Sequence, residues 1–299
     1  MESRRLKSVE SVRAAVDFIE RHLDCRLSLE QTAEAVYYSP YHLHRTFTAV
    51  TGMTLHAYAV RRRLTEGARL LADSSRPVLE IALSCGYESQ QAFTAAFKEM
   101  YKLPPARYRA RGVFYPLQLP ISLEDQDGFE ELSFAEFSNG SVSIRLSEEA
   151  DIPAWMELVC QCVDGYPCLN EREYLQWLRK RIREKQALIL KKGDTVLGVL
   201  GFSKDTGNID FLGILPQYRK RGIAELLLDE LADRYLPGRE ISMTTYREHD
   251  RADTGWRAGL KRLGFEEREE LVEFGYPTQR FVLPLRGHQR VCVKEAERL

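Results

Sequence analysis

The stretch LSLEQTAEAVYYSPYHLHRTFTAVTG, residues 27–52, decides the fold of the first third of the chain. Ser28 with Gln31 forms a capping-box pattern, which predicts the start of a short helix. Ser39 and Pro40 start a second helix, with the serine as N-cap and the proline in the first turn. Two short helices joined by a tight turn predict a helix-turn-helix.

The second of these helices has a polar face that suits DNA. At 100° per residue, Tyr41, Arg45 and Thr48 point to the side opposite the apolar residues Leu43 and Phe47, with His44 on the flank of that polar face. An aromatic ring, an imidazole and a guanidinium can read base edges, and arginine pairs best with guanine. The alternative is a small helical bundle whose outer face is simply polar.

The same pattern recurs in VLEIALSCGYESQQAFTAAFKEMYKLPPARYR, residues 78–109. It predicts a short helix, a turn at Gly86 and a second helix capped by Ser89. Gln90 and Gln91 begin that helix, and glutamine pairs with adenine through two hydrogen bonds. The duplication of the motif with matching caps favours DNA binding over a plain bundle.

A long basic helix is predicted over residues 57–71, between the two units. It would hold the two reading helices for successive major grooves on one face of DNA, roughly 34 Å apart. Arg61, Arg62 and Arg63 on this helix either contact phosphates or form a solvated face. The pair Pro104-Pro105 is expected to end the helical set.

These two stretches resemble the DNA-binding domain of the AraC/XylS family of bacterial transcription regulators, over residues 8–111. The resemblance implies binding to asymmetric sites in double-stranded DNA through both reading helices. It assigns base contacts to Tyr41, His44, Arg45, Gln90 and Gln91. In close relatives an arginine often stands where this chain has Ala95, which implies one base contact fewer in the second half-site.

Length and composition favour two folded domains. The chain has 299 residues, of which 44% are hydrophobic and 29% charged, and this excludes disordered, collagen-like and disulfide-scaffold proteins. Residues 1–112 carry a balance of +5 and the remainder −6, so the front suits a polyanion. Sparse cysteines, no signal sequence and no apolar run of roughly 18 residues predict a cytoplasmic protein without a membrane partner.

Residues 113–140 are predicted to be an acidic connector after a domain at 1–112. They contain six acidic residues and neither Lys nor Arg. Phe129, Leu132, Phe134 and Phe137 are too apolar for a solvated tether, so part of the connector is expected to pack as a strand.

From residue 141 onward, strands and helices alternate, which predicts an α/β or α+β domain over 141–285 and a polar tail at 286–299. The expected strands are 142–146, 187–190, 195–202, 209–214, 240–246 and part of 266–285. The expected helices are 151–163, 171–185, 222–235 and 254–263.

A basic turn between a strand and a helix is the most informative feature of this second domain. It lies in IDFLGILPQYRKRGIA, residues 209–224. Free backbone N–H groups at a helix start, with Gly222 allowing close approach and Lys220 and Arg221 adding charge, suit a pyrophosphate. The alternative is a basic helix start without a ligand.

The segment from Arg219 to Ala224, after a strand, resembles the acetyl-CoA signature of the GNAT N-acetyltransferase superfamily, and KRLGF, residues 261–265, resembles a later junction of that fold. The resemblance covers residues 142–284. It implies acetyl-CoA as cofactor, with its pyrophosphate on turn amides and its pantetheine arm along the preceding strand. The residues carried over are Leu212, Gly213, Ile214, Lys220, Arg221, Gly222, Ile223, Ala224 and Glu225.

Transfer of an acetyl group to a small amine needs a base and an acid. Asp210 is the candidate base and Tyr246 the candidate acid. Glu248, also a candidate catalytic residue, could bind a cationic substrate or relay a proton, together with His249 and Asp250. Each of these groups has an alternative role as a solvated or hydrogen-bonded residue.

The chain departs from the GNAT pattern at two positions. Many relatives carry a tyrosine acid where this chain has Leu260, and Asp253 replaces an asparagine that often contacts the cofactor. These departures put turnover in question and leave the fold unaffected.

No metal and no hydrolase chemistry are expected. Cys160, Cys162 and Cys168 match no zinc spacing and lack a nearby fourth ligand. The sequence lacks G-x-S-x-G and H-E-x-x-H motifs.

The predicted protein has several domains: an all-α double helix-turn-helix followed by an α/β (α+β) GNAT acyltransferase fold with a central mixed sheet. It is expected to be a sequence-specific transcription regulator whose second domain acetylates a small amine. In the alternative reading, the second domain senses an effector or acyl-CoA without turnover and thereby controls DNA binding.

Overall fold

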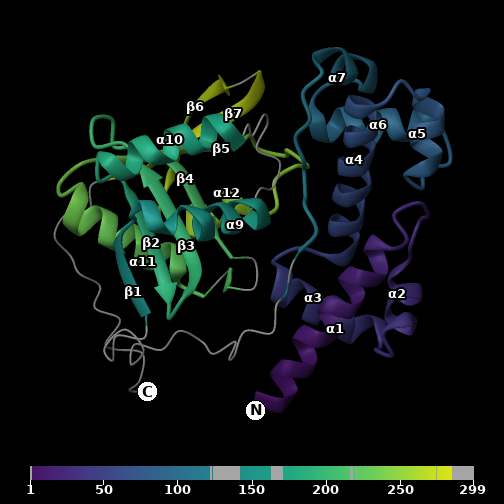
Figure 1. The fold of residues 1–299 in the computed structure, drawn as a ribbon, viewed down its shortest axis with the longest axis horizontal. Coiled ribbons are helices and arrows are strands. Elements are labelled where there is room, and N and C mark those ends of the chain that lie inside the picture. Colours follow the sequence, from purple (N-terminus) through teal and green to yellow (C-terminus); the bar gives the residue numbers. More distant parts are fainter. Residues whose placement is uncertain are drawn as a thin grey trace.

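The computed structural model describes residues 2–121, 123, 142–162, 171–215, 218–219, 221–273 and 275–284. A helical half and an α/β half stand side by side, and the stretch after α7 runs between them alongside α4 (Figure 1). No helix in the described ranges is both long and apolar enough to cross a membrane.

The helical half is two lobes joined by the long helix α4 (Figure 1). Its elements are α1 (Glu2–Glu20), α2 (Leu29–Ala35), α3 (Pro40–Thr51), α4 (Leu55–Asp73), α5 (Val78–Ser84), α6 (Gln90–Tyr101) and α7 (Pro105–Arg111).

The predicted caps position both reading helices. Ser39 Oγ accepts from the N–H of His42 at 3.3 Å at the start of α3, and Ser89 Oγ accepts from the N–H of Ala92 at 3.1 Å at the start of α6. The capping box at Ser28 is present in full. Each lobe then buries its own apolar cluster, so each helix-turn-helix has a separate core.

The expectation that Pro104-Pro105 ends the helical set is wrong, because α7 begins there. Pro105 occupies the first turn of α7, where the missing N–H costs no hydrogen bond. Tyr108 on α7 is 1% exposed and packs edge-on against Phe97. A helix that follows a proline pair is therefore part of the second lobe's core.

The first residues of the predicted connector belong to the helical half in packing. Tyr115, Leu117, Ile121 and Leu123 are buried in the apolar clusters of the two lobes. The hydroxyl of Thr65 on α4 accepts from the N–H of Leu117 at 3.0 Å. The four phenylalanine and leucine residues proposed to form a strand within 129–137 lie outside the described residues.

The α/β half contains two antiparallel sheets, ordered β1-β2-β3-β4 and β5-β7-β6. The strands are β1 (Val142–Leu146), β2 (Ala187–Lys192), β3 (Thr195–Phe202), β4 (Ile209–Ile214), β5 (Ile241–Tyr246), β6 (Glu266–Glu273) and β7 (Tyr276–Leu283). The helices are η1 (Glu149–Asp151), α9 (Ile152–Cys162), α10 (Glu171–Arg183), α11 (Ile223–Glu230), η3 (Leu231–Tyr235) and α12 (Trp256–Arg262).

Helices cover both faces of the first sheet at strand glycines. A methyl group at Gly198 would lie 2.8 Å from Ile223 on α11, while one at Gly201 would collide with the ring of Trp177 on α10. Successive side chains of a strand point to opposite faces, and these two positions on β3 differ by an odd number. The helix that follows the basic turn therefore packs on the face opposite α10.

The two sheets separate next to the basic turn. The parallel link between them in the described part of the chain is the single bridge between Asn208 and Ser242, after which β4 and β5 belong to different sheets. The predicted fold class is confirmed, with the mixed sheet divided into two antiparallel parts at this point.

Candidate functional site

The five predicted base-reading side chains are all exposed. On α3, Tyr41 is 72% exposed and the guanidinium of Arg45 lies 5.7 Å from the centre of its ring, with His44 also exposed. On α6, Gln90 and Gln91 are exposed at the N-terminal end. The apolar faces of the same helices are buried, so their orientation leaves these side chains available to a ligand.

The arginines of α4 serve neither phosphates nor solvent, and both expectations for them are wrong. Arg61, Arg62 and Arg63 are 2%, 6% and 7% exposed. Arg62 forms an ion pair with Glu20 at 2.7 Å, and Arg63 donates to the carbonyl of Gly86 at 3.4 Å. These guanidinium groups therefore form buried contacts between segments of the protein itself.

Arg61 joins the two halves of the protein. Its guanidinium donates to the carbonyl of Ala252 in the α/β half at 3.0 Å and to the carbonyl of Leu117 at 3.0 Å. Ala252 is 1% exposed and belongs to the apolar cluster of the second lobe. The loop after β5 is therefore inserted into the helical half.

Both reading helices end against the α/β half. Gly52, the C-cap of α3, has φ 80°, and a methyl group there would lie 3.2 Å from Cδ of Arg219. Lys102, the C-cap of α6, has φ 58°, and its Nζ donates to Asp250 Oδ1 at 2.8 Å. One loop and one turn of the second domain thus contact the ends of both helices.

Asp250 is the centre of this second contact. Its carboxylate is 5% exposed and also accepts from the hydroxyl of Tyr276 at 3.0 Å and the N–H of Ala252 at 2.8 Å. Burial, followed by the nearby carboxylate of Asp250, raises the pKa of Tyr276, so its hydroxyl remains a donor. The cation that Asp250 binds is Lys102 of the same chain.

The basic turn has an open approach for an anion. Gly222 has φ 78°, and a methyl group at that position would have no neighbour within 4 Å among the residues that the structure describes. The first helical bond of α11 runs from Leu226 N to Gly222 O at 3.0 Å, and no side chain caps the helix start. The amides of Ile223, Ala224 and Glu225 therefore precede the first bond, an arrangement that suits a pyrophosphate.

The turn's charged side chains are only partly placed. The guanidinium of Arg221 lies 5.6 Å from the ring centre of Tyr218. Lys220 falls outside the described residues. The described part of the turn is consistent with an acyl-CoA pyrophosphate held by backbone amides.

The strand before the turn presents backbone groups to the gap between the sheets. Leu215 N donates to the carbonyl of Leu197 on the β3 side at 2.9 Å. Backbone groups alternate along an antiparallel strand, so those of Leu212 and Ile214 point away from β3 and those of Gly213 toward it. The thiol of Cys162 donates to the carbonyl of Ile214 at 2.9 Å, which occupies one acceptor of this edge.

The candidate catalytic groups do not converge. Asp210 is ion-paired with Arg181 at 2.5 Å. Tyr246 packs against the apolar cluster of the second lobe, and Glu248 is exposed in the turn after β5. Leu260, which replaces a tyrosine acid, is fully buried in the core.

Asp253 performs a local structural task. Its carboxylate accepts from the N–H groups of Gly255 at 2.9 Å and Trp256 at 2.7 Å at the start of α12. No group of three or more His, Cys, Asp or Glu residues in the described ranges could hold a metal ion.

Sequence reasoning missed the contacts between domains. Lys102, Asp250, Arg251 and Ala252 form them, yet only Asp250 attracted interest, as a binder of a foreign cation. The one available signal was a lysine directly after a helix, where glycine is usual.

Comparison with known proteins matches each half of the chain to a domain family. Residues 32–111 match the model of a helix-turn-helix domain, and residues 152–265 match the acetyltransferase (GNAT) family. The multiple antibiotic resistance protein MarA of Escherichia coli is 40% identical over 107 residues, which cover 36% of this chain and 84% of MarA. Transcriptional regulator Rob of Salmonella typhimurium is 42% identical over 114 residues, 36% of this chain and 39% of Rob.

Among solved structures, an acetyltransferase of the GNAT family from Bacillus cereus is 17% identical with a TM-score of 0.38, covering 47% of this chain and 95% of its own. The curated relatives match the helical half. The chain belongs to the AraC/XylS family of DNA-binding transcription regulators and carries a GNAT-family domain behind its double helix-turn-helix.

Proposed function

We propose that the GNAT domain is an acyl-CoA sensor that controls DNA binding by the helix-turn-helix domain. One observation carries the proposal: Arg219, which belongs to the basic turn, packs against Gly52 at the end of the reading helix α3. A ligand held by the amides after Gly222 would sit a few residues from this contact.

The DNA-reading role rests on the exposed residues of α3 and α6. Tyr41, His44 and Arg45 would read one half-site, and Gln90 with Gln91 would read the other. Duplex DNA in the cytoplasm is the partner that this arrangement fits.

The cofactor role rests on the open turn and on the edge of β4. Acetyl-CoA would place its pyrophosphate on the amides of residues 221–225 and its arm along residues 212–214. When bound, it supplies an activated acyl group. The protein contributes backbone donors that need no side-chain charge of their own.

The sensor is favoured over an enzyme because the candidate base, the candidate acid and one candidate cation-binding residue already have structural partners. Asp210 is held by Arg181, Tyr246 lies at the domain junction, and Asp250 binds Lys102. A base engaged in an ion pair with a guanidinium is poorly placed to take a proton from an amine.

Coupling requires that the ligand favour one arrangement of the two domains over another. Typical coupling free energies of about 1–3 kcal/mol correspond to affinity changes of about 5–150-fold. The second domain contacts the ends of both reading helices, at Gly52 and at Lys102. A shift in either contact would therefore change the distance between α3 and α6, the two helices that would enter the DNA grooves.

Acetyl transfer to a small amine is the second candidate function. The feature that favours it is the separation of β4 from β5 after the bridge at Asn208, which leaves an edge for the acyl arm next to exposed Glu248. In this version the amine would bind near Glu248.

Isothermal titration of the full chain with acetyl-CoA, together with a thiol assay for released CoA across a panel of amines, separates the two. The sensor predicts binding without CoA release, and binding lost in Gly222→Asp, which adds a carboxylate at the open turn. CoA release with any amine would favour the enzyme, and no binding by the unaltered protein would remove both versions.

A further inference from the structure

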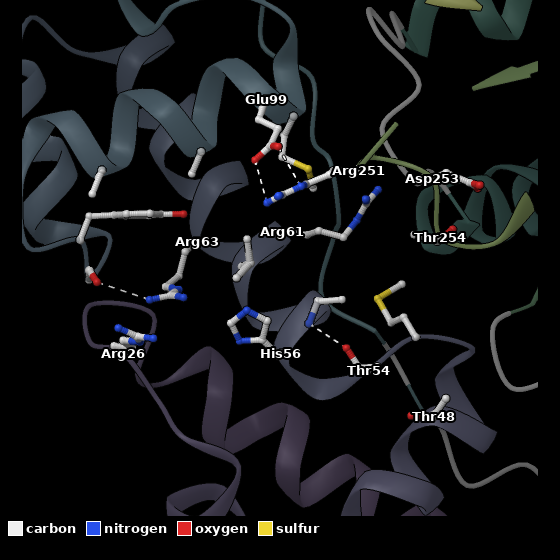
Figure 2. A pocket seen from close by; sticks show the side chains of 18 of the residues that line it. Arg26, Thr48, Thr54, His56, Arg61, Arg63, Glu99, Arg251, Asp253 and Thr254 are labelled. Atoms are coloured by element: carbon white, nitrogen blue, oxygen red, sulfur yellow. Dashed lines mark hydrogen bonds and ion pairs between the residues drawn. The ribbon is translucent and has the colours of Figure 1, made fainter. Parts of the chain in front are cut away.

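A cavity of about 700 Å³ lies where the two lobes and the inserted loop of the GNAT domain meet. Figure 2 shows it with Arg26 and Arg63 on one side, His56 in the middle and Asp253 with Thr254 on the other side. It is lined by residues of α3, α4 and α6 and by Arg251. None of its described lining residues belongs to the basic turn around Gly222.

The cavity contains buried positive charge without carboxylate partners. Arg61 and Arg63 are 2% and 7% exposed, and in the described part of the chain neither guanidinium has a carboxylate oxygen within 4.0 Å. Their hydrogen bonds go to backbone carbonyls, and the guanidinium of Arg63 also lies 5.4 Å from the ring centre of Tyr87. A buried cation without a counter-charge is costly, so an anion bound here would be stabilised.

Unpartnered polar atoms point to the same place. Nε of Arg61, Nε of Arg63, the hydroxyl of Tyr87 and Oγ1 of Thr48 are buried and find no hydrogen-bond partner among the described residues. All four side chains line the cavity. Each buried donor left unsatisfied costs about 1–3 kcal/mol, which a ligand with acceptor oxygens would recover.

Part of the remaining wall is apolar. Met53, Val60, Met100, Ala92 and Ala96 contribute it, and the volume is within the usual range for small-molecule sites. Methionine side chains adapt to irregular ligands. An apolar body with an anionic head therefore matches the lining better than an inorganic anion.

The acidic residues at the cavity do not cancel this preference. Glu99 is engaged by Arg251 at 2.8 Å, and Asp253 accepts from the N–H groups of Gly255 and Trp256 at the start of α12. The third acidic lining residue, Glu88, is exposed, so its carboxylate is solvated. Arg26 is exposed, also lines the cavity and adds a third guanidinium, which has no ion pair among the described residues. A DNA backbone is too wide to reach side chains as buried as Arg61, so a small molecule is the occupant that fits.

We propose that this junction cavity binds a small organic carboxylate with an apolar body, held by Arg63, Arg26 and Arg61. Guanidinium groups recognise carboxylates through paired, charge-assisted hydrogen bonds. A ligand here would touch both lobes and the GNAT loop at once.

The test is calorimetry of the full-length protein with 2-naphthoate and with 2-naphthamide, which has the same ring system without the charge. The carboxylate is expected to bind one per chain and at least tenfold more tightly than the amide. Arg63→Met, which keeps the length of the side chain, is expected to weaken naphthoate binding at least tenfold. Arg234→Met, at an exposed position on the far helix η3, should leave it unchanged.

Arg26→Met keeps the proposal testable if the Arg63 variant fails to fold, because Arg26 is exposed; it should weaken naphthoate binding severalfold. Equal binding of carboxylate and amide, or no effect of either substitution on naphthoate, would overturn the proposal. So would an absence of naphthoate binding combined with weaker non-specific DNA binding by Arg26→Met, since the arginines would then serve phosphates. Acetyl-CoA is not used, so failure here leaves the sensor proposal untouched.

Discussion

The ion pair between Lys102 and Asp250 should be a strong link between the two domains. Its side chains are 24% and 5% exposed, and the N–O distance is 2.8 Å. A charged hydrogen bond in such a setting contributes about 1.5–3 kcal/mol. A double-mutant cycle with Lys102→Met and Asp250→Asn should therefore give a coupling energy of about 2 kcal/mol. Asparagine keeps one acceptor oxygen, which can serve the N–H of Ala252, and the bond from Tyr276 to the other oxygen is lost in both Lys102 backgrounds. That loss therefore cancels in the cycle, which isolates the link between domains.

The assay is urea unfolding followed by tryptophan fluorescence. The three tryptophans, Trp155, Trp177 and Trp256, all lie in the GNAT half, so fluorescence reports on that half alone. Far-ultraviolet circular dichroism reports mainly on the helical half. The two transitions should coincide in the unaltered protein and separate in the variants, because the halves then unfold independently.

The exposed pair Arg234–Glu230, with side chains 68% and 22% exposed, is the matched control. Its coupling should not exceed about 0.5 kcal/mol. If the coupling between Lys102 and Asp250 were equally small, or if the transitions stayed coincident in both single variants, the claim that this contact joins the domains would be refuted.

Three further outcomes are expected. Arg45→Ala should weaken binding to a selected duplex by about 1–3 kcal/mol in filter or anisotropy titrations and leave non-specific affinity nearly unchanged; equal losses on both would argue against base reading. Gly86→Ala should lower the free energy of unfolding of the helical half by about 2 kcal/mol, because φ at this position is 71° and the new methyl group would lie 2.9 Å from the backbone of Cys25. An unchanged urea midpoint would show that the backbone relaxes there without cost. Asp151 is partly desolvated, which raises its pKa, but its bonds to Arg145 and to the Glu148 N–H outweigh this and lower the pKa overall. The stability that Asp151 contributes is therefore present above the ordinary aspartate pKa of about 3.9 and is lost as the pH falls through the lower pKa of the folded state. In urea melts, the difference in unfolding free energy between the unaltered protein and Asp151→Asn should shrink below about pH 4. A difference that stays constant with pH would show that the ion pair contributes nothing.

Local signals predicted most of the elements. Ser28, Ser39 and Ser89 mark helix starts whose capping hydrogen bonds are present. The strand–turn–helix at Gly222, with φ 78°, also follows from a residue type that favours such a backbone. These features depend on a few neighbouring residues, so one sequence suffices to find them.

The failures concern partners that are distant in sequence. A run such as Arg61 to Arg63 looks the same whether it meets phosphate, water or backbone carbonyls, and here the carbonyl of Ala252 lies 191 positions away. Asp250 likewise looked like a binder of an external cation, because nothing local announces Lys102. Pro105 was misread since proline both ends helices and begins them.

The backbone arrangement of the candidate site was predicted better than the roles of its side chains. Exposure of Tyr41 and Gln90 follows from helical periodicity, and the open amides after Gly222 follow from the turn. The roles suggested for Asp210 and Tyr246 depended on which groups would face them in the fold. The structure gives those groups as Arg181 and the second lobe.

The most direct test of the coupling between the two domains is the dissociation constant for a duplex that the protein selects from a random library, measured with and without saturating acetyl-CoA. The sensor predicts a change of at least about fivefold in the unaltered protein and none in Gly222→Asp. An identical dissociation constant with and without acetyl-CoA, in a protein shown by calorimetry to bind it, would contradict the account.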